Sequence, residues 1–477
     1  ISPRVLRELA SELSFPLTVL FRRTMSEGKI PIDWKEAEVK PLFKKGDKSS
    51  ASNYRPVSLT SVVCKVFEGF VRDQLCDHLV KNGLLSDDQF GFTKGRSCVT
   101  QLLVTVNEWM SALDDGLSVD AVYMDLKKAF DTVPYLRLIS KLKGYGIKGE
   151  LLQWISDFLK DRTQYVTVNG NSSERIRVTS GVPQGSVVGP SLFIYFINDM
   201  PAQVECKTKI FADDTKAYAI VDENTESRDL IQRCIDRLVE WTNKWLLEFN
   251  SQKCKVVHLG KNNPQHQYEM RDRDGVRGLE ASQAERDLGV IIDPSLNFET
   301  HINETVKKGN RLAGLLVRTI TNKSTDIMVP LYKALIRPVL EYGNPVWCPF
   351  LRKHIDLLEG VQRRFTKKII NMSNLEYSER MESLRLPSLE YRRLRGDLIE
   401  VFKIVHQYYD LVTTSSLFTF SNNDITRGHN FKLIKTFSKT RQYQQFFTNR
   451  VVTTWNNLPT EAVNATSTDL LLFLLCN

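Results

Sequence analysis

The chain has 477 residues, of which 42% are hydrophobic and 25% are charged. This length exceeds one ordinary domain and predicts two to four subdomains of a folded, globular protein. Apolar stretches such as Leu470 to Leu475 are far too short to span a membrane, and no signal peptide is recognisable at the start. We therefore expect no membrane partner. The first residue, Ile1, is not a methionine, which is consistent with a fragment of a longer protein.

The positive charge is concentrated in the last third of the chain. The net charge is +9, yet residues 1–300 carry 40 Lys and Arg against 41 Asp and Glu, whereas residues 301–477 carry 25 against 15. A basic lobe beside a nearly neutral one fits a nucleic-acid partner, because phosphate contacts release counterions. A basic surface that serves only solubility is the alternative.

The cysteines form no metal-binding or redox motif. They are scattered, without a CxxC pair and without histidines at metal-ligand spacing. We expect reduced structural thiols and a location in the reducing cytoplasm or nucleus. The eight are Cys64, Cys76, Cys98, Cys206, Cys234, Cys254, Cys348 and Cys476.

Hydrophobic periodicity predicts a mixed α+β core followed by a mostly helical, basic region after Thr300. Two polar, glycine-bearing segments, Lys44 to Asn53 and Lys261 to Gly278, are predicted to be loops. Helices are predicted at Val62–Val80, Val99–Leu113, Leu136–Leu142, Glu150–Leu159, Ser191–Ile197 and Arg228–Leu247. Strands are predicted at Val119–Met124, Tyr165–Val168, Arg175–Val178, on both sides of Asp213, at Lys255–Leu259 and at Leu288–Ile292.

Adjacent aspartates occur three times, and only their setting distinguishes them. Asp87/Asp88 and Asp114/Asp115 lie in polar surroundings typical of helix caps and turns. Asp213 and Asp214 lie in IFADDTKAYAIV, between two apolar runs, which predicts a hairpin with carboxylates at its tip. Adjacent carboxylates repel each other unless a cation neutralises them. This pair therefore indicates a metal site.

A second acidic position appears in AVYMDLKKAFDTV, where an apolar strand ends at Asp125. One carboxylate from each of two neighbouring strands is what a two-metal site for phosphoryl transfer needs. Mg²⁺ prefers oxygen ligands, so the absence of His and Cys is expected. We predict two Mg²⁺ ions, or Mn²⁺ in their place.

A third feature is the segment SGVPQGSVVGPSLF, from Ser180 to Phe193. Its glycines and prolines lead into a helix and describe a loop whose backbone can approach a ligand closely. Gln184, between Pro183 and Gly185, suits contact with a nucleotide or template. A purely structural connection is the alternative.

The strings YMDLKKAFD, SGVPQGSVVGPSLF and FADD, in this order, resemble motifs A, B and C of reverse transcriptases from non-LTR retrotransposons of the LINE class, jockey-like ones especially. NYRPVSLTSVVCKVFE, DQFGFTKGRSCVTQLL, LLEFNSQKCKVVHLG and DLGVIID resemble other segments of the same polymerases in the same order. So do YKALIRPVLEYGNPVW and FFTNRVVTTWNNLP near the end, so the resemblance covers nearly the whole chain.

The resemblance implies specific roles. Asp125 and Asp213 would bind both metals, and Asp214 would be a third, less direct carboxylate. Phe130 matches the position of a steric gate against a ribose 2′-hydroxyl, with core packing as the alternative. Nucleotide-binding positions are Arg55, Lys44 or Lys45, Gln184 and Gly185, and Lys253 matches a general acid, with a solvated lysine as the alternative.

The fold implied is a right-hand polymerase of the α+β class, with an antiparallel palm sheet that carries the carboxylates. We predict fingers and an N-terminal region at 1–117, a palm at 118–300, a helical basic thumb-like region at 301–375 and a C-terminal extension at 376–477. The expected activity is extension of a DNA primer on an RNA template with dNTPs. A decayed or domesticated RNA-binding relative without turnover is the alternative.

Overall fold

The centre of the molecule is a five-stranded sheet with the order β12-β9-β3-β8-β7. The computed structural model describes residues 1–273, 275–421 and 428–476, with the side chains at 412, 413, 475 and 476 left out. Strand β3 lies in the middle of this sheet and is antiparallel to both β8 and β9. The strands are β3 (Ser118–Met124), β7 (Lys207–Phe211), β8 (Asp214–Val221), β9 (Lys255–Leu259) and β12 (Glu280–Ala281).

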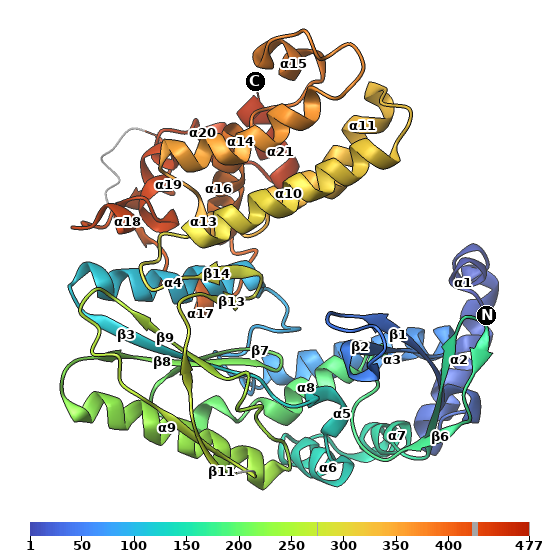
Figure 1. Cartoon of the computed structure of the whole chain (residues 1–477). Coiled ribbons are helices and arrows are strands. Elements are labelled where there is room, and N and C mark those ends of the chain that lie inside the picture. The colour runs from blue at the N-terminus through green and yellow to red at the C-terminus, as the bar shows by residue number, and fades with distance from the viewer. Residues whose placement is uncertain (274, 422–427, 477) are drawn as a thin grey trace.

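Both faces of this sheet are covered, which explains the nearly continuous burial of β3. Successive side chains of a strand point to opposite faces. Val119 and Ala121 therefore join one core cluster, which includes α4 (Cys98–Asp114), whereas Val122 and Met124 join a second, which includes α8 (Gly189–Ile197) and α9 (Thr225–Trp245). Figure 1 shows α4 on one side of the sheet and α9 on the other.

A second sheet lies in the N-terminal part, where β1 is antiparallel to β2 and parallel to β4. Its strands are β1 (Glu36–Phe43), β2 (Tyr54–Leu59), β4 (Arg162–Val168), β5 (Asn171–Ser172) and β6 (Ile176–Val178). The accompanying helices are α1 (Pro3–Glu8), α2 (Ala10–Glu27), α3 (Val62–Lys81), α5 (Ala129–Thr132), α6 (Tyr135–Gly144) and α7 (Gly149–Leu159). Short 3₁₀ turns lie at Ile32–Trp34, Ala51–Asn53 and Pro201–Gln203.

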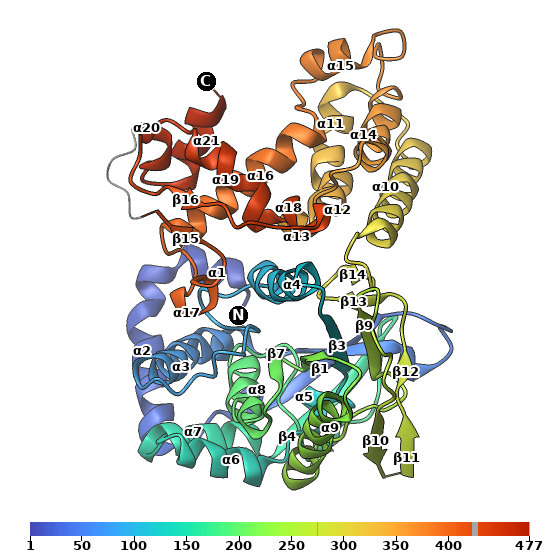
Figure 2. The same cartoon turned by 90° about the vertical axis from the view of Figure 1, so that its left-hand side faces the viewer.

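A helical lobe covers α4 on the side away from the sheet (Figures 1 and 2). Helix α4 contacts α13, α17 and α18, so one apolar core continues from the sheet into the lobe. The lobe contains α10 (Glu299–Thr319), α11 (Thr325–Leu331), a π-helical turn (Tyr332–Ile336), α12 (Arg337–Glu341), α13 (Asn344–Trp347), α14 (Arg352–Thr366), α15 (Tyr377–Ser383) and α16 (Leu389–Val405). It continues through α17 (Leu411–Thr414), β15 (Thr419–Phe420), β16 (Leu433–Ile434), α18 (Arg441–Gln444), α19 (Phe447–Asn456), α20 (Thr460–Val463) and α21 (Thr468–Cys476).

The mixed α+β class is confirmed, and the predicted helices and strands are present with end shifts of a few residues. One predicted loop is wrong in part: residues 261–278 contain the antiparallel ribbon β10 (Glu269–Asp272) and β11 (Gly275–Gly278). Of β10, only Met270 is buried, and the four residues of β11 are exposed, so no apolar alternation marked the ribbon. The domain boundaries stay a prediction.

The expectation of eight reduced thiols is wrong for one pair. Cys206 and Cys234 form a disulfide, because α9 packs beside the segment that leads into β7. Cys64, Cys76, Cys98, Cys254 and Cys348 are free, and the side chain of Cys476 lies outside the described residues. Among the described helices, none has the length and apolar character to cross a membrane.

Candidate active site at the ends of β3 and β8

Three predicted carboxylates meet at one edge of the central sheet. Met124, the last residue of β3, pairs with Thr215 of β8. The next position outward places Asp125 beside Asp214, the first residue of β8. Asp213 lies in the two-residue turn between β7 and β8, whose ends pair at Phe211 and Asp214. The predicted hairpin with carboxylates at its tip is therefore present.

Two of these carboxylates, Asp213 and Asp214, have a raised pKa. Burial and the negative charge of Asp125 raise the pKa of Asp213, while the positive charges of Arg55 and Lys44 act in the opposite direction. Desolvation and the charges of Asp213 and Asp125 raise the pKa of Asp214 to about 6, although its side chain stays open to solvent. Burial and neighbouring like charges have this effect when nearby cations compensate them only in part. A cation bound at these strand ends would therefore stabilise the charged carboxylates.

Lys253 supplies part of that charge. Its Nζ atom lies 2.7 Å from Oδ2 of Asp125. The segment after α9 is held in place by the backbone, because Asn250 donates its N–H to the carbonyl of Asp125. The N–H of Lys127 in turn reaches the carbonyl of Glu248. Two segments about 125 residues apart in sequence thus meet at the predicted site.

The predicted triphosphate-binding cations lie on the β1–β2 hairpin. Leu42 pairs with Arg55, and the N–H of Lys44 donates to the carbonyl of Asn53 just beyond the last pair. Lys44, Lys45 and Arg55 are exposed. Lys45 lines the same cavity as Asp125. The hairpin therefore presents positive charge toward the carboxylates.

The glycine-rich loop is docked tightly against this hairpin. Ser58 of β2 donates its N–H to the carbonyl of Gln184 at 2.7 Å. A Cβ atom on Gly185 would lie 2.2 Å from the carbonyl oxygen of Ser58, and its φ of +124° also favours glycine. The Nε2 atom of Gln184 donates to Asp131 at 2.8 Å. The side chain of Gln184 is thus fixed by a hydrogen bond to the segment that follows Asp125.

Phe130 follows Asp125 in the same segment and is half-buried. Its ring stacks on Phe193 of α8 with centroids 4.4 Å apart, and Phe92 approaches its edge at 6.4 Å. Core packing on one side and partial exposure on the other are compatible with both interpretations of this residue. The steric-gate role stays a prediction.

A cavity of about 390 Å³ opens beside the carboxylates. Its lining includes Asp125, Asp214 and Lys253, together with Lys216 and Asp287. The last two form a buried ion pair, and Tyr123 also donates to Asp287. Sequence reasoning did not single out Asp287, although its charge adds to the raised pKa of Asp214. In the sequence, Asp287 was marked only as the first residue of the segment DLGVIID.

The oxygen-only donor set fits Mg²⁺ chemically. In the described part of the chain, however, no three His, Cys, Asp or Glu side chains are already arranged around one metal position. One oxygen of Asp125 is engaged by Lys253. Metal binding would therefore require this carboxylate to be shared or released.

The other Asp-Asp pairs have structural partners, as their settings predict. Asp88 pairs with Lys209 of β7 at 2.6 Å. Asp114 accepts the backbone N–H groups of Lys439 and Thr440, at the start of α18. Asp88 thus ties its segment to the central sheet, and Asp114 ties the start of α18 to α4.

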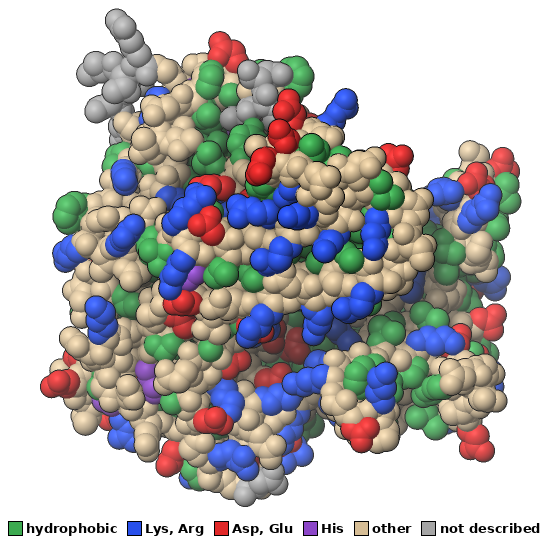
Figure 3. Space-filling model, turned by 45° about the horizontal axis from the view of Figure 1, so that its top comes forward, with side chains coloured by type: hydrophobic (Ala, Val, Ile, Leu, Met, Phe, Trp, Pro, Cys, Tyr) green, Lys and Arg blue, Asp and Glu red, His purple; other side chains and the backbone are tan. Residues whose placement is uncertain are grey.

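A basic groove of about 790 Å³ lies between the hairpin β13 (Glu285–Asp287) and β14 (Val290–Ile292) and the helices α10 and α12. Its cationic lining consists of Arg286, Lys307, Lys308 and Arg311, against one carboxylate, Glu304. Figure 3 shows Lys and Arg side chains gathered over the helical lobe and around a hollow beneath it.

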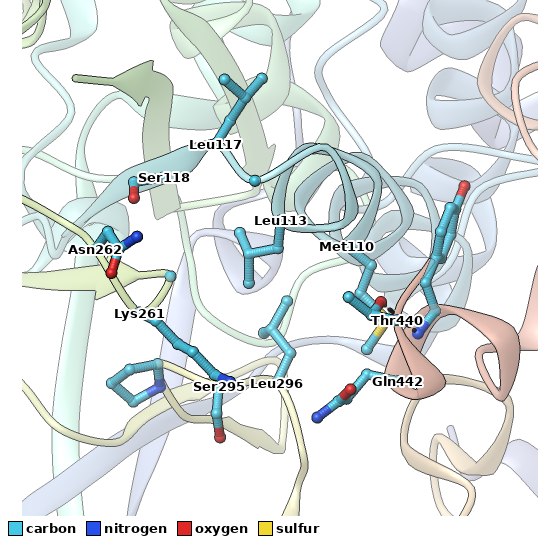
Figure 4. A pocket seen from close by; sticks show the side chains of 14 residues that line it. Met110, Leu113, Leu117, Ser118, Lys261, Asn262, Ser295, Leu296, Thr440 and Gln442 are labelled. Atoms are coloured by element: carbon cyan, nitrogen blue, oxygen red, sulfur yellow. Dashed lines mark hydrogen bonds between the residues drawn. The ribbon is translucent and has the colours of Figure 1, made fainter. Parts of the chain in front are cut away.

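A further cavity, of about 430 Å³, lies at the opposite end of β3 (Figure 4). It is lined by the end of α4, the start of β3 and α18, with Leu113, Ser118 and Gln442 among its side chains. The seven residues of β3 separate it from Asp125 by roughly 23 Å. None of the predicted site residues lines it.

Residues 43–292 match the protein family described as "Reverse transcriptase (RNA-dependent DNA polymerase)". This range includes both strand ends, the glycine-rich loop and the β13–β14 hairpin. The chain belongs to the reverse transcriptase family. The resemblance to non-LTR elements is also confirmed by the relatives described next, and the right-hand polymerase fold is that of this family.

The relatives of this reverse transcriptase include two from Drosophila melanogaster, "Probable RNA-directed DNA polymerase from transposon BS" and "RNA-directed DNA polymerase from mobile element jockey". Each is 27% identical, over 74% and 77% of this chain and 40% and 41% of the relative. The jockey polymerase of Drosophila funebris is 28% identical over 85% of this chain and 45% of its own length. The chain thus spans less than half the length of these relatives.

One solved structure with a partial likeness is an apo telomerase from Candida tropicalis, truncated from its C-terminal domain. The TM-score is 0.39 at 12% identity, over 59% of this chain and 58% of the telomerase chain.

Proposed function

We propose that this chain extends a DNA primer along an RNA template by transferring nucleotides from dNTPs. The observation that supports this most directly is the convergence of Asp125, Asp213 and Asp214 at adjacent strand ends, beside a cavity and opposite the cationic β1–β2 hairpin. In such a site the carboxylates can bind metal ions, and the cationic side chains of the hairpin can bind phosphates. Nucleotidyl transfer needs both.

Mg²⁺ would be held by Asp125 and Asp213, with Asp214 as a third carboxylate, and Mn²⁺ could replace it. When bound, Mg²⁺ supplies charge stabilisation during attack of a primer hydroxyl on the α-phosphate. The residues of the chain supply the rest. Lys44 or Lys45 and Arg55 would hold the triphosphate, and Gln184 and Gly185 would line the nucleotide and template site.

Lys253 is positioned for a further role in the same reaction, the protonation of the leaving group. Its ammonium lies next to Asp125, so it is close to where a leaving pyrophosphate would be released. A positioned ammonium can donate a proton to a leaving group. We propose Lys253 as this general acid.

The basic groove is the proposed path of the RNA–DNA duplex. It starts at the β13–β14 hairpin, whose Asp287 lines the cavity of the carboxylates, and continues along α10. Phosphate backbones bind such cation-rich surfaces without sequence preference.

Primer extension on poly(rA)/oligo(dT) with Mg²⁺ tests the proposal. The wild-type chain should extend the primer, and Asp213→Asn or Asp125→Asn should abolish extension while template binding is largely kept. Removing a ligand charge costs several kcal/mol of transition-state stabilisation. Asp115→Asn is a matched control, at the exposed member of another Asp-Asp pair, and should extend normally.

Two outcomes would contradict the proposal in different ways. A carboxylate variant that keeps more than a few percent of the wild-type rate would refute the metal assignment. RNA binding by the wild-type chain without any extension would instead support the decayed, RNA-binding alternative.

A further inference from the structure

The turn that carries Asp213 has a backbone conformation that needs external support. Ala212 precedes Asp213 in this turn and has φ = +56°. Residues other than glycine rarely adopt this left-handed conformation, which is strained unless neighbouring groups stabilise it. Ala212 is also buried. The direction of the Asp213 carboxylate therefore depends on what holds Ala212.

Gln89 holds it directly. This side chain is completely buried, and its Oε1 atom accepts the N–H of Ala212 at 3.2 Å and the N–H of Gly91 at 2.7 Å. A Cβ atom on Gly91 would lie 2.4 Å from the nitrogen of Ala212, so only glycine permits this approach. A segment far upstream thus clamps the hairpin at its tip.

The backbone of the same segment pairs with β7. Phe90 donates its N–H to the carbonyl of Ile210, and Ile210 donates its own to the carbonyl of Asp88, both at 2.9 Å. These bonds form a parallel bridge between Gln89 and Ile210. They place the carboxamide of Gln89 level with the turn.

Arg96 fixes this segment from the other side. Its guanidinium is almost completely buried and donates to the carbonyl oxygens of Ser86, Asp87 and Gln89 at 2.8–2.9 Å. It also forms an ion pair with Asp410 at 2.6 Å. Asp410 lies 314 residues away, between α16 and α17, and its N–H donates to the carbonyl of Gly95. Removing Asp410 would leave the buried Arg96 guanidinium without this charged partner, which is costly.

We propose that Gln89 is a positioning residue for the Asp213 carboxylate, and that the Arg96–Asp410 ion pair lets the C-terminal extension hold Gln89 in place. The inference rests on the proposed function, because it assumes that Asp213 acts in catalysis. It gives residues 376–477 a role that is separate from binding nucleic acid. The chain of contacts runs from Asp410 through Arg96 and Gln89 to the N–H of Ala212.

The first test replaces Gln89 with methionine, which keeps the length of the side chain and removes the acceptor oxygen. Gln89→Met should lower the single-turnover extension rate at saturating dNTP at least tenfold, while the Kd for the primer–template changes less than twofold. Hydrogen exchange at the Ala212 amide, measured on the whole chain, should accelerate. A residue that only stabilises the fold would not separate rate from affinity in this way.

Gln362→Met is the matched control. Gln362 is also buried and hydrogen-bonded, to Tyr332 and Tyr377, but it lies in the helical lobe. This variant should lose thermal stability and keep the wild-type rate below its melting temperature. Equal rate losses in both variants would overturn the positioning role.

The second test addresses the ion pair. Asp410→Asn and Arg96→Met should each lower the single-turnover rate at least threefold and speed exchange at Ala212. Adding Asp410→Asn to Gln89→Met should cause no further loss of rate, because both act on the same contact. Independent, multiplicative losses would overturn the proposed link.

The proposed function and the positioning role of Gln89 can be refuted separately. If the wild-type chain does not extend a primer, the proposed function fails, and exchange at Ala212 still reports whether Gln89 and Asp410 hold the turn. If the wild-type chain is active and Gln89→Met matches its rate, only the positioning role is refuted.

Discussion

The ammonium of Lys253 is bonded to Oδ2 of Asp125 at 2.7 Å, so a predicted metal ligand already has a positive partner. This contact joins the segment after α9 to the end of β3. It also makes Lys253 a competitor of any cation that Asp125 binds. Removing the lysine charge should therefore favour the metal, even if it harms the chemistry.

We predict that Lys253→Met binds Mn²⁺ or Mg²⁺ more tightly without dNTP, by a factor of up to roughly five, because a partly exposed ion pair is worth at most about 1 kcal/mol. Titration calorimetry on the chain without nucleic acid measures this. Lys253→Arg keeps the charge and should leave the affinity near the wild-type value. Weaker metal binding by the methionine variant would show that Lys253 does not compete for Asp125.

Phe130→Val should raise incorporation of ribonucleotides relative to dNTPs at least tenfold, or about 1.4 kcal/mol of lost discrimination. Because the ring stacks on Phe193, the variant should also lose roughly 1–3 kcal/mol of stability. Single-nucleotide extension with dATP and ATP, with a melting curve, measures both effects. Phe158→Leu, at a buried position of α7, is the control: it should lose stability without changing the choice between dATP and ATP. An unchanged dATP/ATP ratio would leave Phe130 with core packing only.

Replacing Lys308 and Arg311 with alanine should weaken binding to an RNA–DNA duplex and flatten its salt dependence. Each lost phosphate contact lowers the slope of log affinity against log salt by roughly 0.9. Lys143→Ala with Lys148→Ala is the matched control, on exposed positions of the α6–α7 region, far from α10 (Figure 1). Equal slopes for the groove variant and the wild type would reduce the groove to a solubilising surface.

His301 should make the stability of the chain depend on pH. Burial, assisted by the charge of Arg286, lowers the pKa of His301 to about 4, and its Nδ1 atom accepts the N–H of Ile291. The folded state thus favours neutral imidazole, whereas the unfolded state takes up a proton near pH 6.5. This contribution is fully present above pH 6.5 and is lost as the pH falls toward 4.

The loss should amount to about 3 kcal/mol of unfolding free energy, as follows from roughly 1.4 kcal/mol per pKa unit. Urea denaturation at pH 7, 6, 5 and 4 measures it, because the full loss is reached only near pH 4. His301→Asn can keep the contact to Ile291 and does not titrate in this range, so its stability should fall less over the same interval. A parallel decline in both proteins would assign the pH dependence to other groups.

The amino-acid sequence by itself determined the local elements and the residues that carry the predicted chemistry. Apolar runs mark β3, β7 and β8, and polar residues at their ends mark Asp125 and the Asp213–Asp214 tip. Helical periodicity marks α3, α4 and α9. These features depend on contacts between near neighbours in the chain, which is why pattern and motif reveal them.

The tertiary structure alone decided which distant groups meet. Asp287 lies beside Asp214, Lys253 pairs with Asp125, and Cys206 pairs with Cys234, although no local pattern links the members of each pair. The same holds for the ribbon β10–β11, whose single buried side chain leaves no periodic signal. The contact of Arg96 with Asp410 spans 314 residues. Such pairings are set by how helices and sheets pack, and packing depends on all of the chain at once.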